Sequence, residues 1–209
     1  AKAEGAYHGA YDAVVVSLSS GPDNWGDARE PARVPYTHGL PQKTMDDVLV
    51  VPFNDVEATE ALLRRHVDEL AAIVVDPVPP RVGFVPMQSE YARMLRDFAT
   101  EHGIVLVFDE VACFRVGFRG AQSVVGVAPD LTTFGKIIGG GLPVGAVGGR
   151  RDVMAVFDPT SGALRAAHGG TFNGNPMTTA AGAASMNLLS ESRLDDLNAL
   201  GARARDRFN

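Results

Sequence analysis

The chain has 209 residues, of which 45% are hydrophobic and 21% charged, and a formal net charge of −6, as in an ordinary globular protein. No apolar run approaches the about 18 residues that a membrane span needs, so no membrane partner is expected. Lysines and arginines form no cluster that would favour nucleic-acid binding. A single cysteine, Cys113, excludes an internal disulfide, and the first residues lack a signal-peptide pattern, so we expect a cytoplasmic protein.

The first third of the chain predicts strands separated by a loop and a helix. The apolar run 13–18 predicts a buried strand, and residues 19–47, rich in Pro, Gly, Asn and Asp, predict a long loop. A second strand is expected at 48–53. Asn54, with Glu57 three residues later, is expected to cap a helix that leads into a strand at 71–75.

The alternation of strand and helix continues to the end of the chain. Residues 88–102 have helical amphipathic spacing, and the wholly apolar run 104–108 is typical of a strand buried on both faces of a parallel sheet. Weaker signals predict strands at 131–134 and 144–147, and the last stretch predicts helices at 175–189 and 193–208. The fold class expected from this order is α/β, with a mostly parallel sheet flanked by helices.

Two carboxylates, Asp109 and Glu110, directly follow the apolar run 104–108. Ligands bind at the carboxyl ends of parallel strands, where a carboxylate could face a metal ion, an ammonium group or a protonated pyridine nitrogen. An acidic turn without a ligand is an equally good interpretation. A nucleotide-hydrolase site is excluded, because Lys136 is followed by Ile137 and the glycines come after it rather than before.

Lys136 is one of three lysines and stands among apolar residues, with glycines at 139–141. Shielding from water favours the neutral amine, which can attack an aldehyde to form a Schiff base. The glycines would let the backbone approach a bulky ligand closely. The competing interpretation is a glycine-rich turn with a solvated lysine.

Two further segments have ligand-binding character. Residues 168–176, around Thr171, precede a helix and could offer hydroxyl and N–H donors to a phosphate, or could simply cap that helix. Tyr7 and His8 lie between two glycines, and Tyr7 could stack on a planar ligand or belong to the core.

In chain order, these segments resemble the class III aminotransferases, which depend on pyridoxal 5'-phosphate (PLP), and the likeness is strongest to glutamate-1-semialdehyde 2,1-aminomutases and related aminotransferases. The lysine segment is the most specific of them. The resemblance implies PLP fold type I, with 1–209 forming an incomplete PLP-binding large domain; the family's upstream phosphate-binding turn and C-terminal small domain are not visible in this chain. The segments that carry it are 7–9 (YHG), 109–111 (DEV), 135–146 (GKIIGGGLPVGA) and 170–176 (GTFNGNP).

The resemblance implies two catalytic residues. Lys136 would form the internal Schiff base (aldimine) with the PLP aldehyde and then move protons at the amino-bearing carbon. Asp109 would pair with the pyridinium nitrogen and keep the ring electron-withdrawing. No metal site is implied.

The resemblance also implies cofactor contacts on both faces of the ring. Val111 would pack against one face, and Tyr7 and His8 would lie near the other. Thr171 would bind the phosphate of the neighbouring subunit's cofactor, which implies a homodimer.

The implied function is PLP-dependent transfer of an amino group between an amino compound and a carbonyl acceptor. One alternative is glutamate-1-semialdehyde 2,1-aminomutase, an isomerase of tetrapyrrole-precursor synthesis, and a second is a non-catalytic or truncated scaffold. Asp76-Pro77 replaces the family's Glu-Pro, and Arg81 stands where aminomutases place an asparagine; both favour a transaminase. Cys113 is expected to be a packed residue, not a nucleophile. Arginines that could bind a substrate carboxylate are Arg81, Arg115, Arg119 and Arg165.

Overall fold

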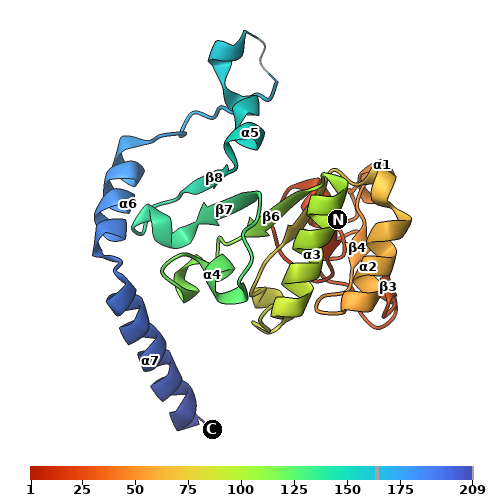
Figure 1. Cartoon of the computed structure of the whole chain (residues 1–209), viewed down its shortest axis with the longest axis horizontal. Coiled ribbons are helices and arrows are strands. Elements are labelled where there is room, and N and C mark those ends of the chain that lie inside the picture. The colour runs from red at the N-terminus through yellow and green to blue at the C-terminus, as the bar shows by residue number, and fades with distance from the viewer. Residues whose placement is uncertain (163–164, 209) are drawn as a thin grey trace.

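The computed structural model, which describes residues 1–162 and 165–208, contains a six-stranded sheet with helices packed against it (Figure 1). Neighbouring strands are parallel except for the last pair in sheet order, which is antiparallel. This confirms the predicted α/β fold with a mostly parallel sheet. In sheet order, the strands are β4 (Val50–Val51), β1 (Lys2–Ala3), β5 (Ala72–Val75), β6 (Val105–Asp109), β7 (Leu131–Gly135) and β8 (Gly145–Gly149).

Among the longer helices, one pair packs beside the strands and the other pair lies at the β7–β8 end of the sheet. In Figure 1, α2 and α3 lie together beside the strands, whereas α6 follows the β7–β8 end and α7 extends beyond it to the C-terminus. None of the described helices is long and apolar enough to cross a bilayer. The α-helices are α1 (Gln42–Asp46), α2 (Val56–Arg65), α3 (Ser89–His102), α4 (Ala121–Val125), α5 (Arg151–Met154), α6 (Pro176–Leu188) and α7 (Glu191–Phe208).

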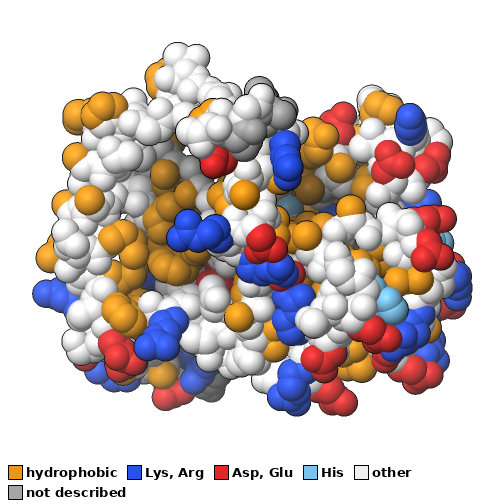
Figure 2. All heavy atoms as spheres, turned by 45° about the horizontal axis from the view of Figure 1, so that its top comes forward, with side chains coloured by type: hydrophobic (Ala, Val, Ile, Leu, Met, Phe, Trp, Pro, Cys, Tyr) orange, Lys and Arg blue, Asp and Glu red, His pale blue; other side chains and the backbone are white. Residues whose placement is uncertain are grey.

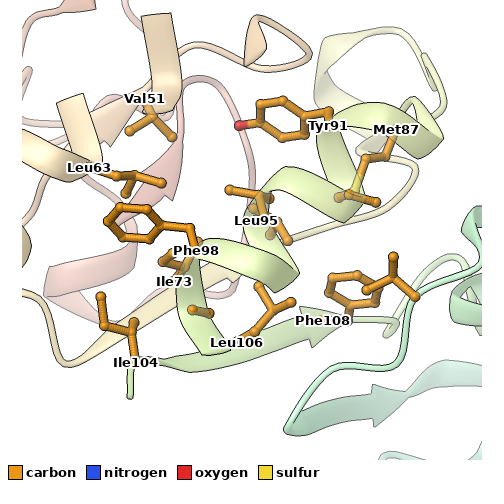
Figure 3. Close-up of a cluster of buried hydrophobic side chains, with 14 of the residues drawn as sticks. Val51, Leu63, Ile73, Met87, Tyr91, Leu95, Phe98, Ile104, Leu106 and Phe108 are labelled. Atoms are coloured by element: carbon orange, nitrogen blue, oxygen red, sulfur yellow. The ribbon is translucent and has the colours of Figure 1, made fainter. Parts of the chain in front are cut away.

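The main core lies between α3 and the strands β5 and β6 (Figure 3). Helix α3 buries Tyr91 and Leu95 on one face, and it ends where Gly103 adopts the left-handed conformation with φ 66°. Leu106 and Phe108 of β6 face this helix and are completely buried. Burying each of these large side chains stabilises the fold by about 1.5–3 kcal/mol. The predicted helix at 88–102 and the predicted strand at 104–108 are therefore confirmed.

The face of β6 that points away from α3 is less buried than the sequence predicted. Val105 and Val107 are only half-buried, whereas the apolar run predicted burial on both faces. The reason is that Val107 lines a cavity and is not covered by a helix. This cavity holds the candidate active site.

The predicted strand at 13–18 is wrong. A short 3₁₀ helix, η1 (Asp12–Val14), is followed by turns, because Ser17 has a left-handed φ of 51° and its hydroxyl is bonded to Ala32 and Val34. Val15, Val16 and Leu18 of the run are still buried, in a small cluster with Leu40 and Met45. The loop predicted at 19–47 also contains α1 and the short hairpin β2 (Gly26–Asp27) and β3 (Glu30–Pro31).

Strand β1, which the sequence did not predict, joins the sheet instead of residues 13–18. Lys2 is 3% exposed, and its ammonium group donates to the carbonyls of Ala3 at 3.0 Å and Val16 at 2.8 Å. Burial lowers the pKa of Lys2 to about 8. The lysine thus ties β1 to the turn that follows residues 7–9.

The start of α2 is capped one residue later than predicted. Asp55, not Asn54, accepts the capping hydrogen bond from Ala58 N. Asn54 adopts a left-handed φ of 63°, and its side chain instead bridges Pro86 O and Gln88 N at the start of α3. Asn54 and Gln88 are far apart in the sequence, so the local pattern could not show that Asn54 makes this contact and leaves the cap of α2 to Asp55.

Close backbone packing joins α6 to the 3₁₀ helix η5 (Lys136–Gly139). A Cβ at Gly182 of α6 would collide with the carbonyl oxygen of Ile138, whereas a Cβ at Gly201 of α7 would meet nothing within 4 Å. We expect Gly182→Ala to destabilise the fold by about 1–3 kcal/mol, because backbone atoms cannot yield as a flexible side chain can. Gly201→Ala is the matched control and should stabilise by about 0.5–1 kcal/mol. Urea unfolding of both variants measures the difference, and equal midpoints would contradict the packing argument.

Candidate active site

A cavity of about 680 Å³ opens at the carboxyl ends of β5, β6 and β7. The face drawn in Figure 2 is hollowed, with hydrophobic side chains at the bottom and basic side chains at the edge. Every site residue predicted from the sequence except Thr171 lines this one cavity: Tyr7, His8, Asp109, Val111 and Lys136. Segments far apart in sequence thus meet where a parallel sheet places its ligands.

Asp109 is the last residue of β6 and is held in a fixed orientation. Its Oδ2 lies 2.8 Å from His8 Nδ1, and its Oδ1 accepts from Val111 N at 3.0 Å and from Thr133 Oγ1 at 3.1 Å. Burial by itself would raise the pKa of Asp109, but the hydrogen bond and charge of His8, with the two other donors, bring it below its usual value. The cavity therefore contains an ionised carboxylate.

His8 connects the segment after β1 to the end of β6. Its side chain is 3% exposed. An ionised carboxylate can only accept, so Nδ1 of His8 must carry the proton that it shares with Asp109. The other ring nitrogen, Nε2, is buried and has no hydrogen-bond partner among the described residues. His8 thus fixes the position of Asp109 and also lines the cavity.

Lys136 follows β7 and is the first residue of η5. Its φ of 48° lies in the left-handed region, which is strained for a residue other than glycine and typical of functional positions. The predicted shielding from water is not found, since Lys136 is exposed. The reason is that Lys136 stands between the main cavity and a second open one of about 550 Å³, which Arg115 and Leu142 also line.

The paired carboxylates at the end of β6 are separated by the structure. Glu110 is fully buried, and its carboxylate turns away from the cavity to accept from Ala121 N at 2.8 Å and Gln122 N at 3.1 Å at the start of α4. Burial raises the pKa of Glu110. Successive side chains of a strand point to opposite faces, so only Asp109 reaches the cavity.

Asp76, at the end of β5, is a cavity residue that the sequence noted only as a departure from the family. It is 3% exposed and accepts from Val78 N at 2.8 Å, whereas the Cys113 thiol donates to the backbone oxygen of Asp109 at 3.6 Å. Burial raises the pKa of both Asp76 and Cys113, which agrees with a packed thiol rather than a nucleophile. The signal that could have identified Asp76 is the one that identified Asp109, an acid directly after an apolar strand.

Thr171 is not brought to this cavity. It is exposed, in the turn before α6, and Asn175 caps that helix by accepting from Met177 N and Thr178 N. Within a single chain, therefore, the polar segment acts as a helix cap, and the predicted phosphate contact of Thr171 stays a prediction.

Of the candidate arginines, only Arg81 lines the main cavity. Arg115 lines the second cavity, and the exposed Arg119 and Arg165 line neither.

Comparison with known proteins identifies relatives that cover nearly the whole chain. A curated glutamate-1-semialdehyde 2,1-aminomutase of Ignicoccus hospitalis is 46% identical over 189 residues, which are 90% of this chain and 42% of that protein. An ω-transaminase from Sphaerobacter thermophilus superposes with a TM-score of 0.94 at 50% identity over 98% of this chain and 47% of its own. A transaminase with PLP bound gives a TM-score of 0.90 at 41% identity over 98% of this chain and 46% of its own.

This chain thus spans about half the length of the proteins that it matches. The family model for class III aminotransferases matches residues 1–209. That match, together with the type I fold shared with these structures, shows that the chain belongs to the class III aminotransferase family.

Proposed function

We propose that this chain is the PLP-binding large-domain part of a transaminase that moves an amino group between an amino compound and a carbonyl acceptor. The observation that carries the proposal is that Lys136 and Asp109 line one cavity. The residues fit PLP, because an amine and an ionised acid in one cavity are what its aldehyde and ring nitrogen require. When bound, PLP supplies an electron-withdrawing ring that stabilises negative charge on the substrate carbon.

The residues of the chain then have distinct roles. Lys136 would hold the cofactor through its amine and would take and return the proton on the carbon that carries the amino group. Asp109, ionised and oriented by His8, keeps a proton on the ring nitrogen. Tyr7 and Val111 line the same cavity and are placed by the proposal on the faces of the ring.

Three further parts of the proposal concern the whole protein. Thr171 is exposed, which leaves its hydroxyl free to reach the cofactor phosphate of a neighbouring subunit in a homodimer. The single cysteine is a free buried thiol, which supports a cytoplasmic enzyme. Small amino and oxo compounds are its proposed partners.

The aminomutase is the second candidate function, and the observation that favours it is the identity of 46% to a curated aminomutase. An aminomutase moves the amino group within one molecule and needs no separate acceptor. Arg81 in the cavity favours the transaminase, because it adds a fixed positive charge where aminomutases have a neutral amide.

The experiment that tests the proposal locates the cofactor and then measures transfer. PLP is added to the protein, the product is reduced with borohydride, and peptide mass spectrometry identifies the modified residue, which we expect to be Lys136. An amino donor should then bleach the visible absorbance and an oxo acid should restore it. Modification of another lysine, or none, would contradict the proposal. Conversion of glutamate-1-semialdehyde alone to 5-aminolevulinate would decide for the aminomutase.

A further inference from the structure

The charged side chains of the main cavity are almost all committed to one another or to the cofactor. Asp109 is paired with His8 at 2.8 Å, and the amine of Lys136 is required by the proposed cofactor. Asp76 accepts a hydrogen bond from Val78 N at 2.8 Å. Arg81 is the cavity cation that remains.

Arg81 is held in place without being neutralised. It lies on a short 3₁₀ helix, η3 (Pro80–Val82), directly after the Asp76-Pro77 end of β5, and two prolines at 79 and 80 restrict the backbone there. Its Nη2 donates to Ser19 Oγ at 2.6 Å. Across the described ranges 1–162 and 165–208, no carboxylate forms an ion pair with it, so its remaining donors are available to an anion.

The other candidate arginines are less well placed. Arg115 is exposed, as Arg81 is, but it lines only the second cavity and not the one that holds Asp109. Arg119 and Arg165 line neither cavity. A guanidinium that is oriented in advance loses less side-chain entropy when it binds, and its planar donors match a carboxylate in two parallel hydrogen bonds. These properties single out Arg81.

We infer that Arg81, positioned by Ser19, binds the carboxylate of the substrate, so that the enzyme selects amino acids and oxo acids over simple amines and aldehydes. This inference rests on the proposed function, because it places the reacting amino group at Lys136 and the carboxylate at the wall that carries Arg81. A site built to pair a carboxylate discriminates strongly against a substrate without one, since its own cation would be left unpaired.

The test uses two reagents that react with the same cofactor carbon and differ by a carboxylate. Aminooxyacetate and methoxyamine both attack the aldehyde carbon of bound PLP and release the Lys136 amine, and the loss of visible absorbance gives the rate without any turnover. With the PLP-loaded enzyme, Arg81→Gln should slow aminooxyacetate about 10- to 100-fold. Methoxyamine should change less than about twofold, since a neutral reagent does not use the guanidinium.

Matched variants separate the inference from a general loss of charge. Arg93→Gln makes the same substitution on the exposed surface of α3, away from either cavity, and should leave both rates unchanged. Ser19→Ala should reduce the preference for aminooxyacetate by a smaller factor, and Arg81→Lys should restore part of it. Circular dichroism checks that each variant is folded.

Several outcomes would overturn the inference. Equal slowing of both reagents by Arg81→Gln would place Arg81 on the cofactor rather than on the substrate. Loss of the preference in Arg115→Gln instead would assign the carboxylate to the second cavity. A wild-type enzyme that forms no visible absorbance with PLP would overturn the proposed function itself, whereas normal absorbance with no preference between the reagents would overturn the inference alone.

Discussion

Lys136→Ala is expected to lower turnover by at least about four orders of magnitude, because it removes both the covalent link to the cofactor and the group that moves the proton. The fold should survive, since the Lys136 side chain is exposed and alanine must adopt the same left-handed φ of 48° as the lysine that it replaces. The measurements are turnover with saturating PLP, the visible absorbance and the urea midpoint. We expect the first two to be lost and the third to be unchanged.

Lys43→Ala is the matched control for this variant. Lys43 is an exposed lysine of α1 and does not line the cavity, so its removal should leave turnover and absorbance as in the wild type. Partial rescue of Lys136→Ala by a small added primary amine would support a proton-transfer role. Full activity of Lys136→Ala would show that the family-specific motif is inert in this protein.

Asp109→Asn is expected to reduce turnover about a hundred- to a thousandfold, because a fixed charge that stabilises developing charge in a closed site has an effect of that size. The amide is nearly the same shape as the carboxylate but cannot keep the ring nitrogen protonated. Single-turnover absorbance of the PLP-loaded variant measures the loss in the chemical step. An unchanged rate would show that Asp109 only anchors His8.

Glu110→Gln is an informative comparison, because the two acids are neighbours that face opposite ways. The Glu110 carboxylate accepts backbone hydrogen bonds from Ala121 and Gln122, so its loss should reduce stability and leave the rate of the PLP-loaded enzyme unchanged. If Asp109→Asn and Glu110→Gln reduced activity equally, the opposite orientations of the two carboxylates would not distinguish their roles.

The pH dependence of Asp109 follows from the sign of its shift. Its pKa is lowered from the usual 3.8, so the ionised form contributes stability that is complete above that value. The contribution is lost as the pH falls through the lower pKa of the folded state. Activity that declines between about pH 5 and 7 would therefore report on another group.

Local patterns in the sequence determined the elements whose environment is simple. The helix Ser89–His102 has regular apolar spacing and a glycine at its end, and the strand before Asp109 is apolar throughout, so short-range preferences and packing agree. The lysine segment is specific enough to indicate the family without any structure. Asp109 was identified as an acid directly after an apolar run, and Lys136 as a lysine among apolar residues and glycines.

Only the tertiary structure decided which side chains meet. His8 and Asp109 are 101 positions apart, and Ser19 and Arg81 are 62 positions apart, so no local pattern could predict either contact. The run 13–18 had the composition of a strand, but Ser17 bends the chain there and β1, with the buried Lys2, enters the sheet instead. The composition of a segment indicates how strongly its side chains avoid water, but it does not indicate which side chains they pack against. The packing of segments that are remote in sequence placed Asp109 in the cavity and turned Glu110 away from it.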